Sequence, residues 1–178
     1  MSPDERQASE PQSLRGWLAK MLASFSTGER RIACRKAIET IKTRVKDAAV
    51  EGFSGDLSTI AAADALAARY PELDILVNNL GIYESKPFQD ITDDDWQRFF
   101  EVNVLSGARL SRLYLAGMLR KNWGRIVFIS SESAIQIPAD MIHYGLTKTA
   151  QLVHQVRAWG SSVELKMGRR QGATTEHM

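Results

Sequence analysis

The middle of the chain alternates short apolar runs with helical stripes, and this alternation constrains the fold more than any other feature. The segments 74–79 and 125–131 are compact apolar runs of strand length, bounded by turn residues. Between them, residues 92–120 carry apolar side chains at steps of three and four, which is typical of a helix. Strands that alternate with helices favour a parallel sheet with helical crossovers. We therefore expect an α/β fold.

Local signals place the remaining elements. Thr92 and Asp95 have the spacing of a capping box, so a helix should begin there. Ser58 is a candidate cap for an alanine-rich helix that Pro71 would end. The expected helices cover 29–46, 59–70, 92–120 and 140–158, and a further strand covers 48–54.

The two ends of the chain have a different texture from its middle. Residues 1–13 are polar with two prolines, which predicts a disordered leader. Residues 14–159 are interpreted as one domain, and 160–178 as a loose tail without a strand. The stripe over 14–25 fits a helix packed on the domain or one that binds a membrane surface or a partner. The basic segment 30–46 fits a solvated face or a phosphate contact.

Composition narrows the classes of function. Lys and Arg number 23 and Asp and Glu 21, a net charge of +2 that gives no reason to expect nucleic acid. One cysteine and three scattered histidines predict no metal site. No apolar run reaches the roughly 18 residues of a membrane span. The opening residues lack a secretory pattern, so we expect a cytoplasmic protein.

Polar residues at the carboxyl ends of the expected strands are the candidates for chemistry, because ligands of parallel sheets bind there. Tyr144 and Lys148 stand four apart on an expected helix and therefore share one face. An ammonium group beside a phenol favours the phenolate form. Such a tyrosine can exchange a proton with a substrate near neutral pH.

Four motifs in register resemble the short-chain dehydrogenases/reductases. They are VNNLG at 77–81, NVLSG at 103–107, GRIVFISS at 124–131 and Tyr144-x-x-x-Lys148, and the resemblance extends over about residues 29–151. Ser131 precedes Tyr144 by 13 residues (144 − 131), as in many members of that family.

The resemblance implies a Rossmann-like parallel sheet with helices on both faces, and hydride transfer between NAD or NADP and an alcohol or carbonyl substrate. Tyr144 would be the general acid/base, and Lys148 would favour its ionised form and bind the nicotinamide ribose. Ser131 would hold the substrate oxygen, and Asn103 would hold a water that links Lys148 to solvent. The implied cofactor-binding residues are Asp56, Leu57, Asn79, Gly81, Tyr144 and Lys148.

Less chemical roles stay open for the same residues. Asn103 could be a buried amide tied to backbone, and the segment 78–81 could be only a turn. His143 is interpreted as non-catalytic, and Trp123, Glu132 and Asp140 are candidates to shape a substrate pocket. The helices 92–120 and 140–158 resemble the family's dimer faces, so the chain is expected to bind a second copy of itself.

The ends depart from the family pattern. The glycine-rich turn that would hold the pyrophosphate is missing, since residues 26–31 contain one glycine followed by charges. The first two and last two strands are expected to be missing or replaced, as in a truncated chain, with a gap of roughly 14 Å beside the strand 48–54. The alternative is a non-catalytic remnant or interaction module that keeps the four residues and binds no cofactor.

Overall fold

The computed structural model describes residues 29–45, 49–153 and 163–170. The chain divides into two compact units, 1–55 and 56–178, which are described separately. The expectations for 1–13 and 14–25, and for the end of the helix predicted over 140–158, lie outside the described residues.

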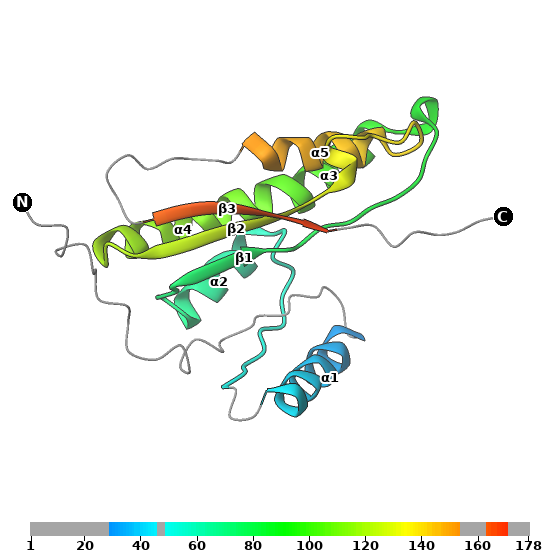
Figure 1. Ribbon diagram of the computed structural model, residues 1–178. Coiled ribbons are helices and arrows are strands. Elements are labelled where there is room, and N and C mark those ends of the chain that lie inside the picture. The colour runs from blue at the N-terminus through cyan, green and yellow to red at the C-terminus, as the bar shows by residue number, and fades with distance from the viewer. Residues whose placement is uncertain (1–28, 46–48, 154–162, 171–178) are drawn as a thin grey trace, which may run out of the picture. The chain divides into compact units, whose positions relative to one another are not determined.

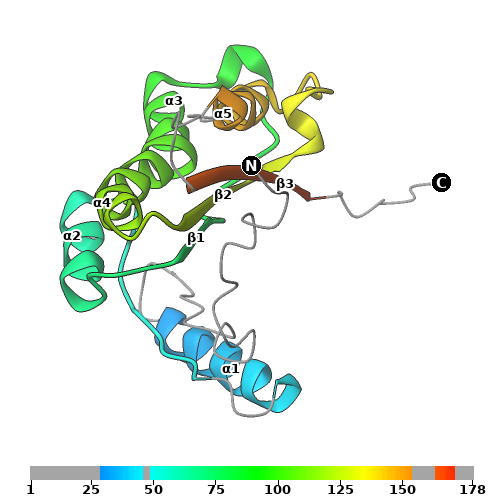
Figure 2. The same cartoon turned by 60° about the vertical axis from the view of Figure 1, so that its left-hand side comes forward.

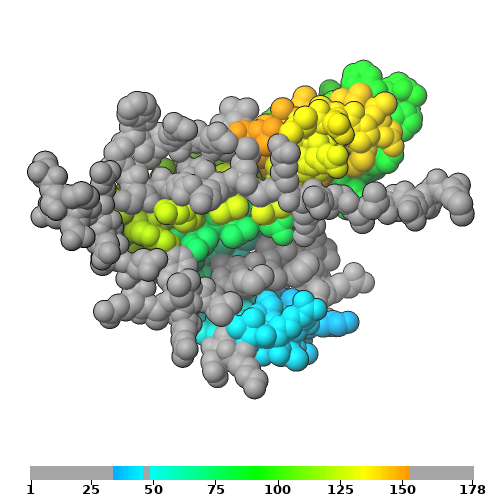
Figure 3. Space-filling model, viewed as in Figure 1, coloured from blue at the N-terminus to red at the C-terminus, as the bar shows by residue number. Residues whose placement is uncertain are grey.

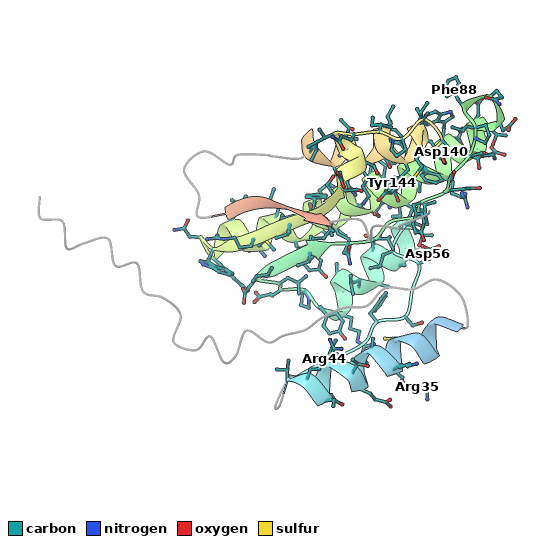
Figure 4. The ribbon with its side chains drawn as sticks, turned by 45° about the vertical axis from the view of Figure 1, so that its right-hand side comes forward. Arg35, Arg44, Asp56, Phe88, Asp140 and Tyr144 are labelled. Carbon is teal, nitrogen blue, oxygen red and sulfur yellow. The ribbon has the colours of Figure 1, made fainter. Side chains whose placement is uncertain are left out.

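The first unit contains helix α1 (Glu29–Arg44). Arg35, Lys36, Lys42 and Arg44 on this helix are exposed to solvent, and Figure 4 labels two of them. Exposed basic side chains of this kind are usually solvated, so they need no ligand to explain them. The helix predicted over 29–46 is confirmed with its end at Arg44.

The strand predicted over 48–54 is wrong. Residues 49–54 have no regular structure. This segment runs close to α1, since a Cβ on Gly52 would lie 2.5 Å from Sγ of Cys34. Val50 in this segment is 8% exposed although it belongs to no strand.

The second unit follows the predicted alternation (Figure 1). Its elements are α2 (Ile60–Arg69), β1 (Ile75–Asn78), the short helix η2 (Phe88–Asp90), α3 (Asp93–Phe100), the π-helical segment η3 (Glu101–Leu105), α4 (Ser106–Arg120), β2 (Gly124–Ser131), η4 (Glu132–Ala134), α5 (Ile142–Val153) and β3 (Val163–Arg170). The strands predicted over 74–79 and 125–131 are confirmed to within a residue at each end.

The strands form a parallel sheet in the order β1-β2-β3. The prediction of no strand after Gln151 is wrong, because β3 pairs with β2 over its whole length. Val163, Leu165 and Met167 alternate with other residues in the sequence, a period of two that is typical of a strand. The expected parallel α/β architecture is confirmed.

The helices α3, α4 and α5 lie on one face of this sheet (Figure 2). Leu76, Ile126 and Phe128 point to that face and are buried. Ile75 and Val77 point to the other face and are exposed. The hydrophobic core of the unit therefore lies between the sheet and these helices.

Caps fix where two helices begin. Thr92 and Asp95 form the predicted capping box at the start of α3. The predicted Ser58 cap of α2 is wrong, because Thr59 is the cap and accepts from the Ala62 N–H. The Ser58 hydroxyl instead donates to Asp56 over 2.6 Å, so it is already engaged.

Candidate active site

Tyr144 and Lys148 lie one turn apart on α5, which packs against the carboxyl end of β2. The Lys148 ammonium donates to the Ile129 carbonyl over 3.0 Å. Ser130 in turn donates to the Lys148 carbonyl over 3.0 Å. The ammonium nitrogen lies 5.7 Å from the centre of the Tyr144 ring, within the range of a cation–π contact. The pair therefore lies where parallel sheets bind their ligands.

Asn103 stands in the π-helical segment between α3 and α4 and is 1% exposed. Its side chain accepts from the Ile82 N–H over 2.8 Å and donates to the Ile82 carbonyl over 3.0 Å. It also donates to the Thr147 hydroxyl over 2.9 Å. Single π turns often occur at functional sites. Through these hydrogen bonds of Asn103, the π turn is connected both to the loop after β1 and to α5.

Gly81 brings that loop next to both groups. A Cβ on Gly81 would lie 3.4 Å from Oδ1 of Asn103 and 3.4 Å from Nζ of Lys148. Gly81 is itself exposed. A side chain here would therefore contact the two groups that the structure brings together.

Polar contacts hold the loop that follows Gly81 in place. The Lys86 N–H donates to the Asp140 carbonyl over 2.7 Å, and the Ser85 hydroxyl donates to the Asp140 carboxylate. Lys86 also pairs with Asp95 at 2.6 Å. The Lys86 ammonium, and then Thr92, hold the pKa of the Asp95 carboxyl well below its usual range. Asp140 thus ties this loop to the segment that leads into Tyr144 (Figure 4).

Ser131 ends β2 and is half-buried. Its hydroxyl accepts from the Ser133 N–H over 3.2 Å, which begins the short helix η4. Thr149 on α5 donates to the Ala134 carbonyl over 2.8 Å, so η4 is held against α5. Both Ser131 and Tyr144 therefore belong to segments that pack on each other.

The other predicted cofactor residues have different surroundings. Asn79 is exposed at the end of β1. Asp56 accepts from the N–H and the hydroxyl of Ser58, so its carboxylate stabilises the turn before α2. Leu57 is 6% exposed and belongs to the core. Trp123 precedes β2, at the opposite end of the strand from Ser131, so its predicted place in a substrate pocket is wrong.

His143 is fully buried beside Tyr144. Its ring packs on Phe99, with centroids 4.1 Å apart, and lies edge-on to Trp96. Neither ring nitrogen has a hydrogen-bond partner. Burial lowers the pKa of this imidazole. An apolar packing role suits these surroundings.

The sequence did not identify two further residues that contact Asn103 and Lys148. Thr147 accepts from Asn103 and donates to the Tyr144 carbonyl over 2.7 Å. Gln151 accepts from Lys148 over 3.2 Å and donates to the Asn103 carbonyl over 2.5 Å. For Gln151, the spacing in the sequence was a usable signal, because Gln151 follows Lys148 by three residues and therefore shares its helix face.

Within the described part of the chain, no group of three or more His, Cys, Asp or Glu side chains is placed to hold a metal ion. No helix among the same residues has the length and apolar character needed to cross a membrane.

Parallel α/β sheets bind their ligands beyond the carboxyl ends of the strands, and the Tyr–Lys pair and the buried Asn lie at that end of this sheet. The family model for short chain dehydrogenases matches residues 18–162. The chain belongs to the short-chain dehydrogenase/reductase family, which confirms the sequence-based assignment.

Relatives and solved structures agree with this membership. The chain is 47% identical over 130 residues to uncharacterized oxidoreductase YvaG of Bacillus subtilis, a match that covers 73% of this chain and 49% of that protein. It is 48% identical over 104 residues to YvrD of the same organism, with 57% and 40% covered. A solved putative betaketoacyl-ACP reductase superposes with a TM-score of 0.74 at 25% identity, covering 88% of this chain and 65% of that one. The chain thus spans about half the length of these curated relatives.

Members of this family bind NAD or NADP, so the fit of the residues to such a cofactor matters. Gly81 lies next to Nζ of Lys148 and the Asn103 amide, polar groups that would hold the nicotinamide ribose. The sequence ahead of the first described helix contains no glycine-rich turn of the kind that holds the pyrophosphate.

Proposed function

We propose that this chain carries the reaction site of an NAD- or NADP-dependent oxidoreductase that acts on an alcohol or carbonyl group. The observation that carries the proposal is the position of the Lys148 ammonium, 5.7 Å from the Tyr144 ring centre and next to Gly81 and Asn103. Family membership adds support. The substrate class follows from the family rather than from any feature of a pocket.

The proposed chemistry assigns one task to each side chain. Tyr144, as a phenolate, accepts the hydroxyl proton of an alcohol, or as a phenol gives its proton to a carbonyl oxygen. Lys148 stabilises the phenolate and binds the nicotinamide ribose. Ser131 holds the substrate oxygen by a hydrogen bond. When bound, the nicotinamide supplies or accepts the hydride.

Asn79 and Gly81 are proposed to line the cofactor, and Asp56 and Leu57 to flank its adenine. The missing glycine-rich turn removes two or three hydrogen bonds to the pyrophosphate, each worth about 1.5–3 kcal/mol. An affinity that is ordinarily micromolar should therefore fall to the millimolar range. Self-association through α3 to α5, where Phe100 and Leu146 are exposed, stays a prediction.

The alternative function is a non-catalytic interaction module, favoured by the same missing turn. Calorimetric titration with NADH and NADPH up to about 10 mM, well above a millimolar dissociation constant, separates the two. We expect weak binding together with slow turnover of small alcohols and ketones.

The matched variants for this test are Tyr144→Phe and Tyr83→Phe. Tyr83 is exposed, with its ring centre 6.4 Å from that of Tyr144, so it controls for loss of a nearby hydroxyl. Tyr144→Phe should lower turnover about 100-fold or more, and Tyr83→Phe should leave it unchanged. Equal activity in both variants would contradict the role of Tyr144. Absence of both binding and turnover would favour the interaction module.

A further inference from the structure

The buried hydrogen bonds around Lys148 assign a role to a residue that the proposed chemistry leaves unused. Gln151 is 2% exposed and lies one turn after Lys148 on α5. Its Oε1 accepts from Nζ of Lys148 over 3.2 Å. Its Nε2 donates to the main-chain carbonyl of Asn103 over 2.5 Å. One side-chain amide therefore connects the helix of the Tyr–Lys pair with the π turn.

We propose that Gln151 is a positioning residue that holds the Lys148 ammonium in place by bridging it to the Asn103 carbonyl. The proposal rests on the proposed function, in which Lys148 acts on Tyr144 and the cofactor. The bridge uses both polar atoms of the amide, so none is left without a partner in a buried place. An unpaired buried polar atom would cost free energy, so the folded state favours this pairing.

The bridge changes what the resemblance implied for Asn103. A water held by Asn103 was expected to link Lys148 to solvent. The amide of Gln151 contacts both Lys148 and the Asn103 carbonyl. An amide N–H does not give up its proton near neutral pH, so this link fixes Lys148 without passing protons along it. Proton exchange at Lys148 through Asn103 should therefore be slow.

A second contact limits how Lys148 can move. Its ammonium also donates to the Ile129 carbonyl, on the strand that packs against α5. The two acceptors come from different elements, and together they aim the ammonium along one direction. Loss of the Gln151 acceptor leaves the Ile129 contact in place, so the expected effect is looser binding of the ammonium rather than its complete release.

The experiment follows the ammonium directly and does not need turnover. In the full chain labelled with ¹⁵N-lysine, a hydrogen-bonded buried ammonium should give an NMR signal whose protons exchange slowly with water. Lys148→Arg identifies the signal. Gln151→Met removes both hydrogen bonds at similar volume and should speed exchange about tenfold or more, as expected for a lost bond to a charged group. Gln97→Met, at an exposed position of α3, should leave exchange unchanged.

Gln151→Glu provides the second variant, since its carboxylate keeps an acceptor for Lys148 but cannot donate to the Asn103 carbonyl. Exchange in this variant should be faster than in the parent chain, because the bridge is broken, and no faster than in Gln151→Met. An unchanged exchange rate in Gln151→Met, exchange in Gln151→Glu as slow as in the parent chain, or no protected Lys148 signal in the parent chain would each overturn the proposal. If the signals behave as expected while Tyr144→Phe leaves activity unchanged, the proposed function fails and the bridge stands.

Discussion

The two faces of the sheet are covered very differently. On the face beneath α3, α4 and α5, Leu76, Ile126 and Phe128 are 7%, 1% and 2% exposed. On the opposite face, Ile75 and Val77, which flank Leu76 on β1, are 39% and 53% exposed. Strands of parallel sheets are usually buried on both faces. In this part of the chain, one face supplies most of the core.

This difference explains where the candidate site can form. Lys148, Asn103 and Gln151 are all buried between the sheet and the helices of the covered face. A side chain can be held in one orientation there because neighbours surround it. The surface of α5 and the segment before it is shown from yellow to orange in Figure 3.

Truncation of one residue on each face should give the largest effect. Phe128→Ala removes a buried ring and should lower the free energy of unfolding by about 3–5 kcal/mol. Val77→Ala removes two half-exposed methyl groups and should cost about 0.5–1 kcal/mol. Urea unfolding of both variants measures the contrast. Similar losses in the two would mean that the face of Val77 is covered as well.

A smaller effect tests how closely α4 approaches the covered face. A Cβ on Gly107 would lie 2.7 Å from the Phe128 ring, so Gly107→Ala must displace that ring. We expect a loss of about 1–3 kcal/mol in unfolding free energy.

Gly117 in the same helix is the matched control, because a Cβ there would lie 3.7 Å from its nearest neighbour, the end of the Arg120 side chain. Gly117→Ala should stabilise the protein by about 0.5–1 kcal/mol through helix propensity. Stabilisation by Gly107→Ala as well would show that α4 is not tightly packed on β2.

The smallest effect concerns the interior of the helix layer. Burial lowers the pKa of His143, so the folded state binds its proton less readily than the unfolded state does. Stability should therefore be complete above the unfolded value of about 6.5 and fall as the pH drops from there toward the folded pKa. The loss is at most about 1.4 kcal/mol per pH unit.

His143→Phe removes this titration while keeping an aromatic ring against Phe99. Chemical unfolding of parent and variant between about pH 7.5 and 5 spans the window. We expect the parent to lose stability more steeply than the variant over that range. Parallel curves for the two proteins would show that His143 is protonated as easily in the folded chain as in the unfolded one.

Local signals in the sequence were enough to predict most elements of the second unit. The apolar runs of β1 and β2 were recognisable as strands because each is short, continuous and followed by polar residues. The capping box at Thr92 was recognisable because its two hydrogen bonds join residues three apart. The spacing of Tyr144 and Lys148 placed them on one helix face for the same reason.

Elements that depend on distant partners were predicted less well. Residues 49–54 look like a strand, yet the packing of that segment near α1 leaves it without a ladder. The polar stretch that contains β3 carries only a weak alternation, and its pairing with β2 decides its conformation. Strand formation requires a neighbour, which local sequence does not specify.

The sequence by itself determined the family, the order of strands β1 and β2 with their helices, and the residues that form the Tyr–Lys pair. Only the tertiary structure decided that Gln151 joins Lys148 to the Asn103 carbonyl, that Thr147 joins Asn103 to the Tyr144 carbonyl, and that Asp56 is engaged by its own turn. Motif spacing reports which residues share a helix face or a strand end. The hydrogen-bond partner of a buried polar group depends on which distant element packs against it.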